Sequence, residues 1–497
     1  MEQLKDGLIV DLVITKFNEV YVKIQCDDGI AQELHEYFSF YVPNFQFTPQ
    51  FRKKLWNGKI YLFDLRSRLL FHGLITYVEK FCRDRKYTYH LDTLVLLSEN
   101  WSEQEAKDFI QTLSLPEEIQ LRDYQFDTII HTIRNRRQLI VSPTGSGKSL
   151  VLYCLTRYFL CRDLQKVLII VPTTSLVEQL TSDFHLYGWD VDQFVHKQYA
   201  GKEKITKKPV TITTWQSIYE FPASYFEQFD AVLGDECHLF KAKSLQSIMT
   251  KLTRTLFRIG TTGTLDGTKT NRLVLEGAFG PVYRATSTKD LMESETLAEI
   301  KIKALILKYD EATCKQLKSS NYQEELDFVV QHSKRNKFIA NLALSLPGNT
   351  LILFQFIDLQ GKKLYNMIQS LAPERSISYV HGGVEADERE RIRQCVNQSS
   401  NAIVLGSSGT FSTGVNIPNL HNIIFASPSK SRIRVLQSIG RGLRRTEEKS
   451  TMTLFDIADD LRTGKPMNYL LQHYIERLKI YDEEQFTYQQ YYIDLTK

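Results

Sequence analysis

The chain lacks the cysteine pattern of a protein built on disulfides or structural metal. Its seven cysteines are odd in number, far apart and never spaced Cys-x-x-Cys. This pattern excludes a disulfide framework, a zinc ribbon and an iron–sulfur cluster. We therefore expect reduced thiols and a cytoplasmic protein.

Long hydrophobic runs are also missing. The longest apolar stretch, around Val167 to Val171, has only the length of a strand, and a membrane-spanning helix needs about 18 residues or more. The N-terminal stretch MEQLKDGLIVDLVITKF carries acidic and basic residues among its apolar ones, unlike a signal peptide. The sequence therefore predicts no membrane segment.

An excess of charge of one sign is absent too. Lys and Arg number 62 and Asp and Glu 58, which leaves a net charge of +4. This balance excludes a protein that binds polyanions by bulk charge alone. Low-complexity linkers and internal repeats are missing as well. At about 150 residues per domain, a chain of 497 residues predicts about three domains.

Short apolar runs, spaced by amphipathic helical stretches, dominate the chain after its first hundred or so residues. One series reads QLIVSP, KVLIIVP, PVTITTW, AVLGDE and FRIGTTG, and a second reads IKALILKY, NTLILFQF, RSISYVHG, AIVLGSSG, NIIFASP and MTLFDIAD. Such runs are typical of buried parallel strands. We predict an α/β protein with a small α+β N-terminal domain and two tandem parallel-sheet domains. The expected domains are 1–112, 113–290 and 291–497.

A phosphate-binding loop follows the first of these strands. The strand at Gln138 to Val141 leads into the loop Ser142, Pro143, Thr144, Gly145, Ser146, Gly147, Lys148 and Ser149. Its glycines let backbone N–H groups surround a phosphate, Lys148 reaches the β and γ oxygens, and the Ser149 hydroxyl is a ligand for Mg²⁺. The loop predicts ATP and Mg²⁺ as cofactors.

A pair of acidic residues, Asp235 and Glu236, follows the strand AVLG, 87 residues after Lys148. The first acid at such a strand end can hold the magnesium ion, and the second can orient the attacking water. We therefore predict Asp235 as a second metal ligand and Glu236 as a catalytic residue.

Together these residues resemble the superfamily 2 helicases, from about residue 120 to 450, which implies a RecA-like fold for both parallel-sheet domains. Asp235 to His238 (DECH) resembles the DEAD and DEAH boxes, and Thr262 to Thr264 resembles the relay called motif III, to which His238 would couple the ATP site. The resemblance implies that Arg122, Tyr124 and Gln125 bind adenine. It also implies phosphate contacts to nucleic acid at Pro172, Thr173, Thr174, Thr214, Trp215 and Gln216.

The second strand series carries the remaining motifs of that family. The resemblance implies nucleic-acid contacts at Phe356, His381, Gly382 and Thr413, and nucleotide contacts at Gly414 and Asn416. Asn416 replaces the commoner Asp, which puts a carboxylate contact to ribose there in doubt. The stretch from Gln437 to Arg445 matches QxxGRxxR, so Arg441 and Arg444 are expected to neutralise the γ-phosphate, worth about 10³- to 10⁵-fold in rate.

Further stretches resemble a narrower family, the recombination helicases of T-even-like phages. They include FSFYVPNFQFTPQFRKKLWNGKIYLFDLRSRLLFHGL, YQEE before SKRNKFIA, and FSTGVNI before LQSIGRGLRR. This resemblance implies a monomeric ATP-dependent DNA helicase acting on Holliday junctions, stalled forks, D-loops and R-loops. It implies RNA–DNA hybrids and recombination and replication proteins as further partners, and the host cytoplasm as location if a phage encodes the chain.

The N-terminal region changes charge sharply along its length. Residues 51–90 hold ten bases and three acids, whereas residues 1–50 hold three bases and eight acids. We predict DNA contact for Arg52, Lys53 and Lys54. The aromatics among these bases are Phe51, Trp56, Tyr61, Phe63 and Phe71. We interpret them as the region's own core, with stacking at a DNA junction as the alternative.

Three alternatives to the DNA helicase stay open from sequence. An RNA helicase shares every ATP motif, and a translocase subunit of a restriction-type complex belongs to the same ATPase class. A binding or annealing module with an inactive ATP site is the third, although Lys148, Asp235, Glu236 and Arg441 are all present.

Overall fold

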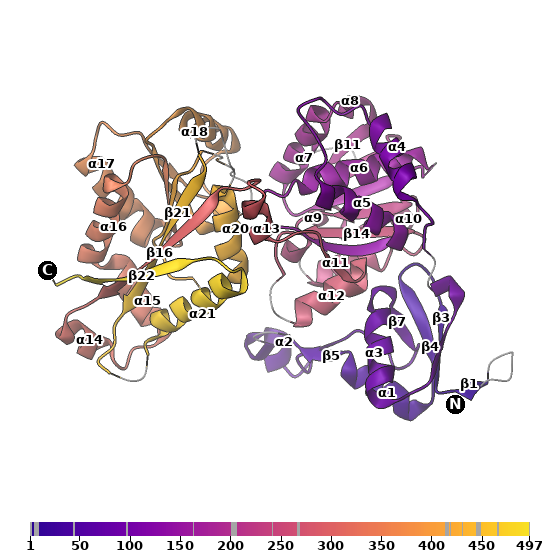
Figure 1. Cartoon of the computed structure of the whole chain (residues 1–497). Helices are drawn as coiled ribbons and strands as arrows, with labels where there is room; N and C mark the ends of the chain where they lie inside the picture. The colour runs from indigo at the N-terminus through magenta and orange to yellow at the C-terminus, as the bar shows by residue number, and fades with distance from the viewer. Residues whose placement is uncertain are drawn as a thin grey trace. The chain divides into compact units, whose positions relative to one another are not determined.

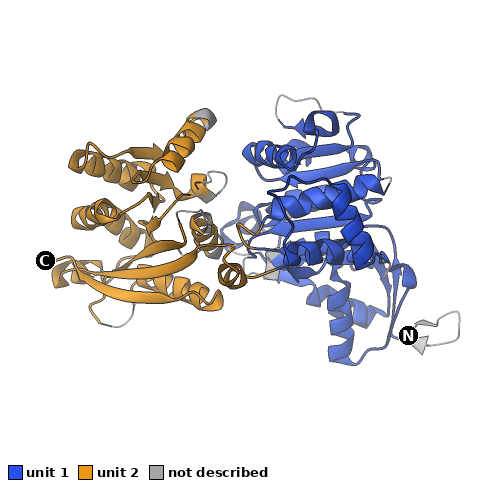
Figure 2. Ribbon diagram, turned by 45° about the horizontal axis from the view of Figure 1, so that its top comes forward, with its two compact units in different colours: residues 1–142, 147–285 blue, residues 143–146, 286–497 orange. Residues whose placement is uncertain are grey.

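The computed structural model describes most of the chain. The described residues are 2–3, 9–42, 45–95, 98–162, 164–199, 206–240, 242–265, 269–412, 417, 419–429, 431–443, 449–464 and 467–496. They form two compact units, the first made of residues 1–142 and 147–285 and the second of residues 143–146 and 286–497 (Figure 2).

The first unit begins with a small α+β region (Figure 1). Its elements are β1 (Glu2–Gln3), β2 (Ile9–Val10), β3 (Leu12–Lys16), β4 (Tyr21–Gln25), α1 (Asp28–Tyr37), β5 (Ser39–Tyr41), η1 (Phe45–Phe47), α2 (Pro49–Arg52), β6 (Lys59–Tyr61), β7 (Leu69–Phe71), η2 (His72–Leu74), α3 (Ile75–Arg85), β8 (Tyr89–Leu91) and η3 (Thr93–Val95). A four-stranded sheet in the order β7-β4-β3-β8 forms its centre, and β5 pairs with β6 separately. Helix α4 (Glu103–Thr112) follows in the chain, and its Ala106 belongs to the core of the parallel domain described next.

The rest of the first unit is a parallel α/β domain. Its elements are α5 (Asp123–Asn135), β9 (Arg137–Val141), α6 (Lys148–Cys161), β10 (Val167–Val171), α7 (Thr174–Leu186), α8 (Val191–Phe194), β11 (Val195–Gln198), β12 (Val210–Thr214), α9 (Trp215–Ile218), α10 (Ala223–Phe226), β13 (Ala231–Gly234), η4 (Cys237–Leu239), α11 (Ala242–Met249), β14 (Phe257–Thr262), α12 (Lys269–Phe279) and β15 (Val282–Arg284). The sheet order is β11-β12-β10-β13-β14-β9-β15, and its neighbours pair in parallel.

The second unit contains another parallel sheet. Its elements are α13 (Thr288–Glu293), β16 (Glu299–Lys308), α14 (Glu311–Leu317), α15 (Tyr322–Gln331), α16 (Ser333–Ser345), β17 (Thr350–Phe354), η5 (Ile357–Gly361), α17 (Lys362–Leu371), β18 (Ile377–Val380), α18 (Ala386–Gln398), β19 (Ile403–Ser407), α19 (Ser408–Ser412), β20 (Asn422–Phe425), α20 (Arg432–Gly442), β21 (Thr451–Asp460), α21 (Tyr469–Glu483) and β22 (Tyr488–Asp494). Its order is β18-β19-β17-β20-β21-β16-β22.

The predicted fold class is confirmed: two parallel seven-stranded sheets of the RecA-like kind follow a small α+β region. Every residue of β9, β10, β12, β17 and β19 is buried, as expected for strands covered by helices on both faces. The domain boundaries drawn from sequence, 112/113 and 290/291, stay a prediction.

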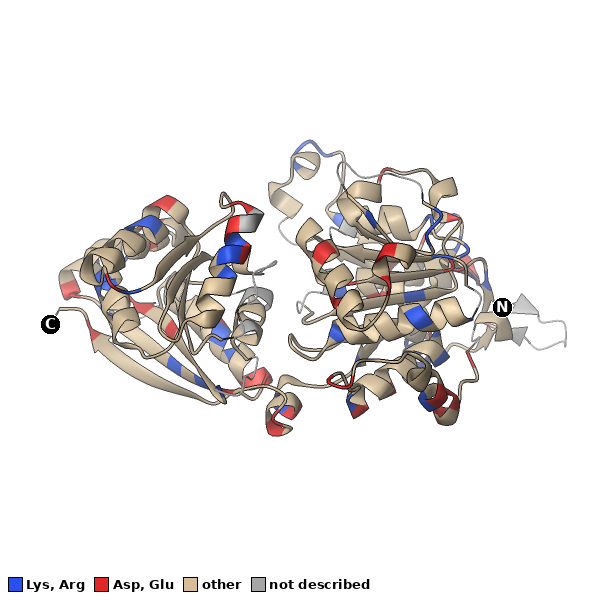
Figure 3. Cartoon of the chain, turned by 90° about the horizontal axis from the view of Figure 1, so that it is seen from above, with Lys and Arg blue, Asp and Glu red and all other residues tan. Residues whose placement is uncertain are grey.

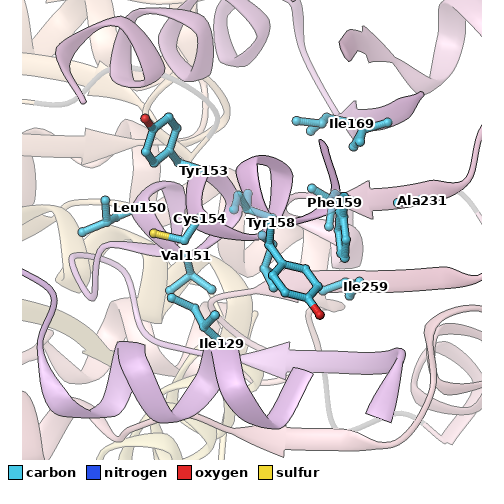
Figure 4. Packing of buried hydrophobic residues seen from close by; sticks show 14 of the residues in the cluster. Ile129, Leu150, Val151, Tyr153, Cys154, Tyr158, Phe159, Ile169, Ala231 and Ile259 are labelled. Carbon is cyan, nitrogen blue, oxygen red and sulfur yellow. The ribbon is translucent and has the colours of Figure 1, made fainter. Parts of the chain in front are cut away.

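Helix α6, which follows the phosphate loop, runs through the core of the first parallel domain. Its buried side chains include Leu150, Tyr153 and Phe159, and they pack among Ile129, Ile169 and Ile259 from neighbouring elements (Figure 4). This packing fixes α6 against the sheet, and with it the first residues of the helix, Lys148 and Ser149.

The α+β region is docked on the same unit through α12. Val274 of α12 belongs to the core cluster of that region, and a Cβ on Gly73 of η2 would lie 2.0 Å from the Glu276 carbonyl oxygen. Glu19 accepts a hydrogen bond from Arg137 of β9 at 2.5 Å. The region therefore forms one packed body with the sheet that carries the phosphate loop.

None of the seven cysteines forms a disulfide, as predicted. Cys237 is buried, its thiol donates a hydrogen bond to the Gly234 carbonyl at 3.1 Å, and burial raises its pKa well above the usual value. It fills space between strands and is not a nucleophile. In the described part of the chain, no helix combines the length and apolar character that a bilayer crossing requires.

Candidate nucleotide site and nucleic-acid surfaces

The phosphate loop leaves β9 and ends at the first turn of α6. Gly145 and Gly147 have φ angles of +86° and +77°, which residues with a side chain rarely adopt. The Ser146 N–H donates to the Pro143 carbonyl oxygen at 3.2 Å. The predicted residues Pro143 to Gly147 thus form a tight turn before a helix N-terminus, a backbone arrangement that binds anions.

Lys148 and Ser149 occupy the first two positions of α6. The Lys148 ammonium donates to the Ser142 carbonyl at 3.2 Å and lies 3.8 Å from Glu236 Oε1. The Ser149 hydroxyl shares a hydrogen bond of 2.8 Å with the Tyr187 hydroxyl. The lysine is therefore held beside the acidic pair, as the predicted phosphate contact requires.

Asp235 follows β13 and lies among groups that control its charge. Its Oδ1 accepts hydrogen bonds from the Thr261 hydroxyl at 2.6 Å and from the Glu236 N–H at 2.9 Å. Burial and the adjacent Glu236 raise its pKa to about 6, against the opposing effect of Lys148. A bound cation would therefore offset the cost of burying the negative charge of this carboxylate.

The donor set suits magnesium. Among the described residues, no cluster of three or more His, Cys, Asp and Glu side chains could hold a metal ion by itself. Mg²⁺ is usually bound by one or two carboxylates together with substrate phosphates and water. Asp235 and the Ser149 hydroxyl fit this pattern beside the phosphate loop.

A chain of polar contacts connects the acidic pair to Thr262 on β14. The Thr262 hydroxyl donates to the Thr264 carbonyl at 2.8 Å, so its oxygen accepts from His238 Nδ1, which lies 2.6 Å away. The same nitrogen lies 3.4 Å from Glu236 Oε2. His238 thus contacts both Glu236 and Thr262, and its role in coupling the ATP site to motif III stays a prediction.

Glu236 itself has an unusual backbone. Its φ angle is +47°, a left-handed conformation that is uncommon for glutamate. Its Oε2 accepts a long hydrogen bond of 3.5 Å from the Gly263 N–H. The strained turn directs one carboxylate toward both Lys148 and motif III.

The predicted adenine contacts lie at the start of α5. Gln125 is buried, and its amide donates to the Gly147 carbonyl at 3.4 Å, while its oxygen accepts the Arg122 N–H at 2.9 Å. The Arg122 guanidinium donates to the Tyr124 hydroxyl at 3.1 Å. Gln125 is therefore packed against the phosphate loop, and the contact of all three residues with adenine stays a prediction.

Two predicted nucleic-acid segments meet at the carboxyl ends of the adjacent strands β10 and β12. Thr173 caps α7, and the Gln216 amide donates to the Pro172 carbonyl at 3.1 Å. Thr214 shares a hydrogen bond of 2.8 Å with Ser217, while Thr174 and Gln216 are exposed. The structure brings these two segments together on one edge of the sheet. Trp215, which lies between Thr214 and Gln216 in the chain, is half-buried.

The second unit places two predicted segments after strands β17 and β18, which lie on either side of β19 in its sheet. Phe356 is half-buried after β17, and His381 and Gly382 follow β18, with Gly382 exposed. His381 Nδ1 accepts the Gly383 N–H at 3.1 Å, and its ring lies 5.1 Å from that of Tyr379. Both segments stand at the carboxyl edge of one sheet.

Several predicted residues lie outside the described residues: Thr413, Gly414, Asn416 and Arg444. Arg441 lies within α20, whose last residue, Gly442, accepts a hydrogen bond of 2.5 Å from the buried ammonium of Lys449. A lysine at the carboxyl end of a helix stabilises it. Sequence reasoning missed Lys449, because nothing near it in the chain marks it as a cap.

The N-terminal region divides the predicted aromatics into two groups. Phe63 and Phe71 are buried, which confirms them as core. Tyr61 is 40% exposed and stacks on His35 at 4.4 Å, whereas Phe51 and Trp56 are half-buried.

The predicted DNA-contact bases Arg52, Lys53 and Lys54 lie at the end of α2 and are all exposed. Beside them are two exposed apolar residues that sequence reasoning missed, Phe47 at 69% and Leu55 at 77%. The lack of any acidic residue from 39 to 61 was the signal that could have drawn attention to them.

Three family models match the chain in succession. They are "DNA helicase UvsW, N-terminal" at residues 11–92, "Type III restriction enzyme, res subunit" at 118–267 and "Helicase conserved C-terminal domain" at 333–446. The ATP-dependent DNA helicase uvsW of Enterobacteria phage T4 is 34% identical over 488 residues, 94% of this chain and 96% of that protein.

Solved structures and a more distant relative agree with these matches. A crystal structure of T4 UvsW has a TM-score of 0.53 and 32% identity, covering 98% of this chain and 100% of that one. The DNA 3'-5' translocase XPB2 of Sulfurisphaera tokodaii is 24% identical over 387 residues, 70% of this chain and 84% of that protein.

Proposed function

We propose that this chain, which belongs to the UvsW family of ATP-dependent DNA helicases, unwinds or branch-migrates branched DNA. The proposed substrates are Holliday junctions, stalled forks, D-loops and R-loops formed in recombination, repair and replication. The proposed partners are DNA, RNA–DNA hybrids, and proteins of recombination and replication. We propose a monomer in the cytoplasm, which is that of the host cell if a phage encodes the chain.

One observation carries the proposal: the contact path from Lys148 through Glu236 and His238 to Thr262. It connects the phosphate loop to the strand that ends in motif III. A change at the γ-phosphate alters the charge that Glu236 faces, and His238 passes this change to the Thr262 hydroxyl. Such a path suits an ATPase that does mechanical work on a bound polymer.

The proposed ATP site uses the side chains already described. Mg²⁺, when bound with ATP, neutralises charge on the phosphates. Lys148 binds the terminal phosphates, Ser149 and Asp235 hold the ion, and Glu236 orients the attacking water. The roles of Arg441 and Arg444 at the γ-phosphate and of Gly414 and Asn416 at the nucleotide are proposed from their sequence motifs.

The proposed DNA contacts use few charges. Thr173, Thr174, Thr214 and Gln216 present hydroxyl and amide groups at one sheet edge, which suits phosphate contact without base reading. His381, Gly382 and Phe356 extend this set in the second unit, and Thr413 is proposed from its motif. Specificity then comes from DNA structure.

The test compares ATP hydrolysis in the presence of RNA, single-stranded DNA and a four-way junction. We expect the junction to stimulate hydrolysis most and to be resolved only with ATP. Lys148→Ala is the control and should abolish both signals. Greater stimulation by unbranched RNA would favour an RNA helicase. Translocation on duplex DNA without strand separation would favour a restriction-type translocase, the class that the family model at residues 118–267 describes.

A further inference from the structure

A separate lobe of the N-terminal region combines exposed apolar side chains with uncompensated positive charge. It comprises residues 39–42 and 45–61, and we call it the basic fin. Its strands β5 and β6 form their own two-stranded sheet, and in Figure 1 α2 and β5 lie to one side of the four-stranded sheet. The fin is therefore a distinct surface with its own small interior.

The two most exposed apolar residues of the fin take no part in the packing of that interior. The Phe45 ring stacks on Tyr41 at 4.8 Å and meets Phe51 edge-on at 4.7 Å. Gly58 lies so close that a Cβ there would come within 2.2 Å of the Phe45 ring. Phe47 and Leu55 remain 69% and 77% exposed, so the fold does not need them for its own packing.

The charge around these two residues has one sign. Residues 39–61 contain Arg52, Lys53, Lys54 and Lys59 and no Asp or Glu. Among the described residues, no carboxylate forms an ion pair with Arg52, Lys53 or Lys54. Lys54 has a φ angle of +57°, so the chain turns sharply where the three bases follow one another.

The fin is firmly mounted on the rest of the first unit. Tyr61, at the end of β6, stacks on His35 of α1 at 4.4 Å, and His35 Nδ1 contacts the Phe63 carbonyl at 2.9 Å. The core beneath α1 includes Val274 of α12. A force on the fin is thereby passed to the domain that carries the phosphate loop.

We propose that the basic fin is a wedge for the branch point of DNA, an inference that rests on the proposed helicase function. Phe47 and Leu55 pack against the bases that become unstacked where strands separate, and Arg52, Lys53 and Lys54 bind the phosphates beside them. Only nucleic acid offers flat apolar faces and regularly spaced negative charges together. A protein partner would need an unusually acidic surface around an apolar one.

The test uses Phe47→Ala combined with Leu55→Ala in the full chain. A four-way junction carries 2-aminopurine at its branch point, and both fluorescence and ATP-driven branch migration are recorded. We expect the double variant to lose the fluorescence change and to migrate the junction at least about tenfold more slowly, the effect of one lost stacking contact. Its ATP hydrolysis with single-stranded DNA should match the wild type.

Phe17→Ala is the matched control, because Phe17 is 58% exposed in the same region but outside the fin. It should behave as the wild type in every measurement. If the double variant shows wild-type fluorescence and migration, the fin is not a wedge. A protein-binding surface would then explain why Phe47 and Leu55 are exposed. If the wild type itself fails to migrate the junction, the proposed function fails, whereas a migrating wild type without a 2-aminopurine signal removes the wedge alone.

Discussion

Single side chains decide how the ATP site communicates with the rest of the first unit. His238 is positioned between Glu236 and the Thr262 oxygen, and the Thr262 hydroxyl proton is already used by the Thr264 carbonyl. A substitution at Thr262 therefore removes the contact with His238. The contacts of Lys148 with Ser142 and of Asp235 with Thr261 do not depend on it.

Thr262→Val should separate ATP hydrolysis from work on DNA. Valine keeps the shape of threonine but offers His238 no acceptor, and one buried hydrogen bond contributes about 1 kcal/mol. We expect basal ATP hydrolysis to stay close to the wild-type rate and junction unwinding to fall about fivefold. Steady-state hydrolysis and unwinding measured on the same preparation check this, and an equal loss of both would contradict it.

His72 makes the stability of the first unit depend on pH. The ring is buried, its Nε2 lies 3.1 Å from the Val95 carbonyl, and burial followed by the charge of Arg137 lowers its pKa to about 2. Unfolding restores a pKa near 6.5, so below pH 6.5 the unfolded chain binds a proton at His72 and the folded chain does not. The stabilisation is complete above pH 6.5 and is lost as the pH falls below it.

His72→Gln should therefore flatten the pH dependence of stability. For the wild type, one proton costs about 1.4 kcal/mol per pH unit below 6.5, or about 2 kcal/mol between pH 6.5 and 5. Urea unfolding of both proteins at pH 8, 6.5 and 5 measures the difference. Parallel losses of stability in the two proteins would show that other groups dominate.

At the scale of helices and strands, η2 and α12 approach each other closely. Gly73 faces the Glu276 carbonyl, and Gly277 faces the Phe71 side chain. On the same helix, the Ala278 carbonyl accepts a hydrogen bond from Arg258 of β14, which also donates to the Met249 and Leu252 carbonyls. The strand that ends in motif III thus holds the carboxyl ends of two helices, one of which carries the N-terminal region.

Gly73→Ala should loosen this docking. The new Cβ would lie 2.0 Å from the Glu276 carbonyl oxygen. Because that oxygen belongs to the backbone, the clash is relieved only if helix α12 shifts, and we expect such overpacking to lower the free energy of unfolding by about 1–3 kcal/mol. Thermal unfolding should show a lower midpoint for the first unit. Gly382→Ala is the control, since a Cβ there has open space, and an equal midpoint for both variants would refute the close contact.

The whole molecule is nearly neutral, and its charges of both signs are spread over both units (Figure 3). The proposed contacts at the sheet edges are hydroxyls and amides, which release few counterions when DNA binds. The exposed bases of the fin are a local exception. The salt dependence of DNA binding should therefore come largely from this small part of the chain.

Reversing the charge of Arg52, Lys53 and Lys54 to Glu should change that dependence more than any other surface substitution. Each phosphate contact contributes about 0.9 to the slope of log affinity against log salt for duplex DNA. We expect the triple variant to lose about 2–3 units of slope, measured by fluorescence anisotropy from about 50 to 300 mM salt. The double variant Phe47→Ala, Leu55→Ala should keep the wild-type slope, and an unchanged slope in the triple variant would exclude DNA contact at this cluster.

Sequence by itself determined the features that depend on neighbours in the chain. The phosphate loop is recognised because Gly145, Gly147 and Lys148 need only local backbone geometry, and the buried strands are recognised because continuous apolar runs suit strands covered on both faces. The order of the strand series then implied two parallel sheets after a small α+β region.

Tertiary structure alone decided which residues meet across long stretches of chain. Phe63 and Phe47 look alike in sequence, yet packing places the first in a core and leaves the second 69% exposed. The contact of His238 with Thr262 and the cap that Lys449 forms on Gly442 depend in the same way on how strands and helices are stacked. Burial is a property of the assembled layers, and a local pattern of residue types cannot contain it.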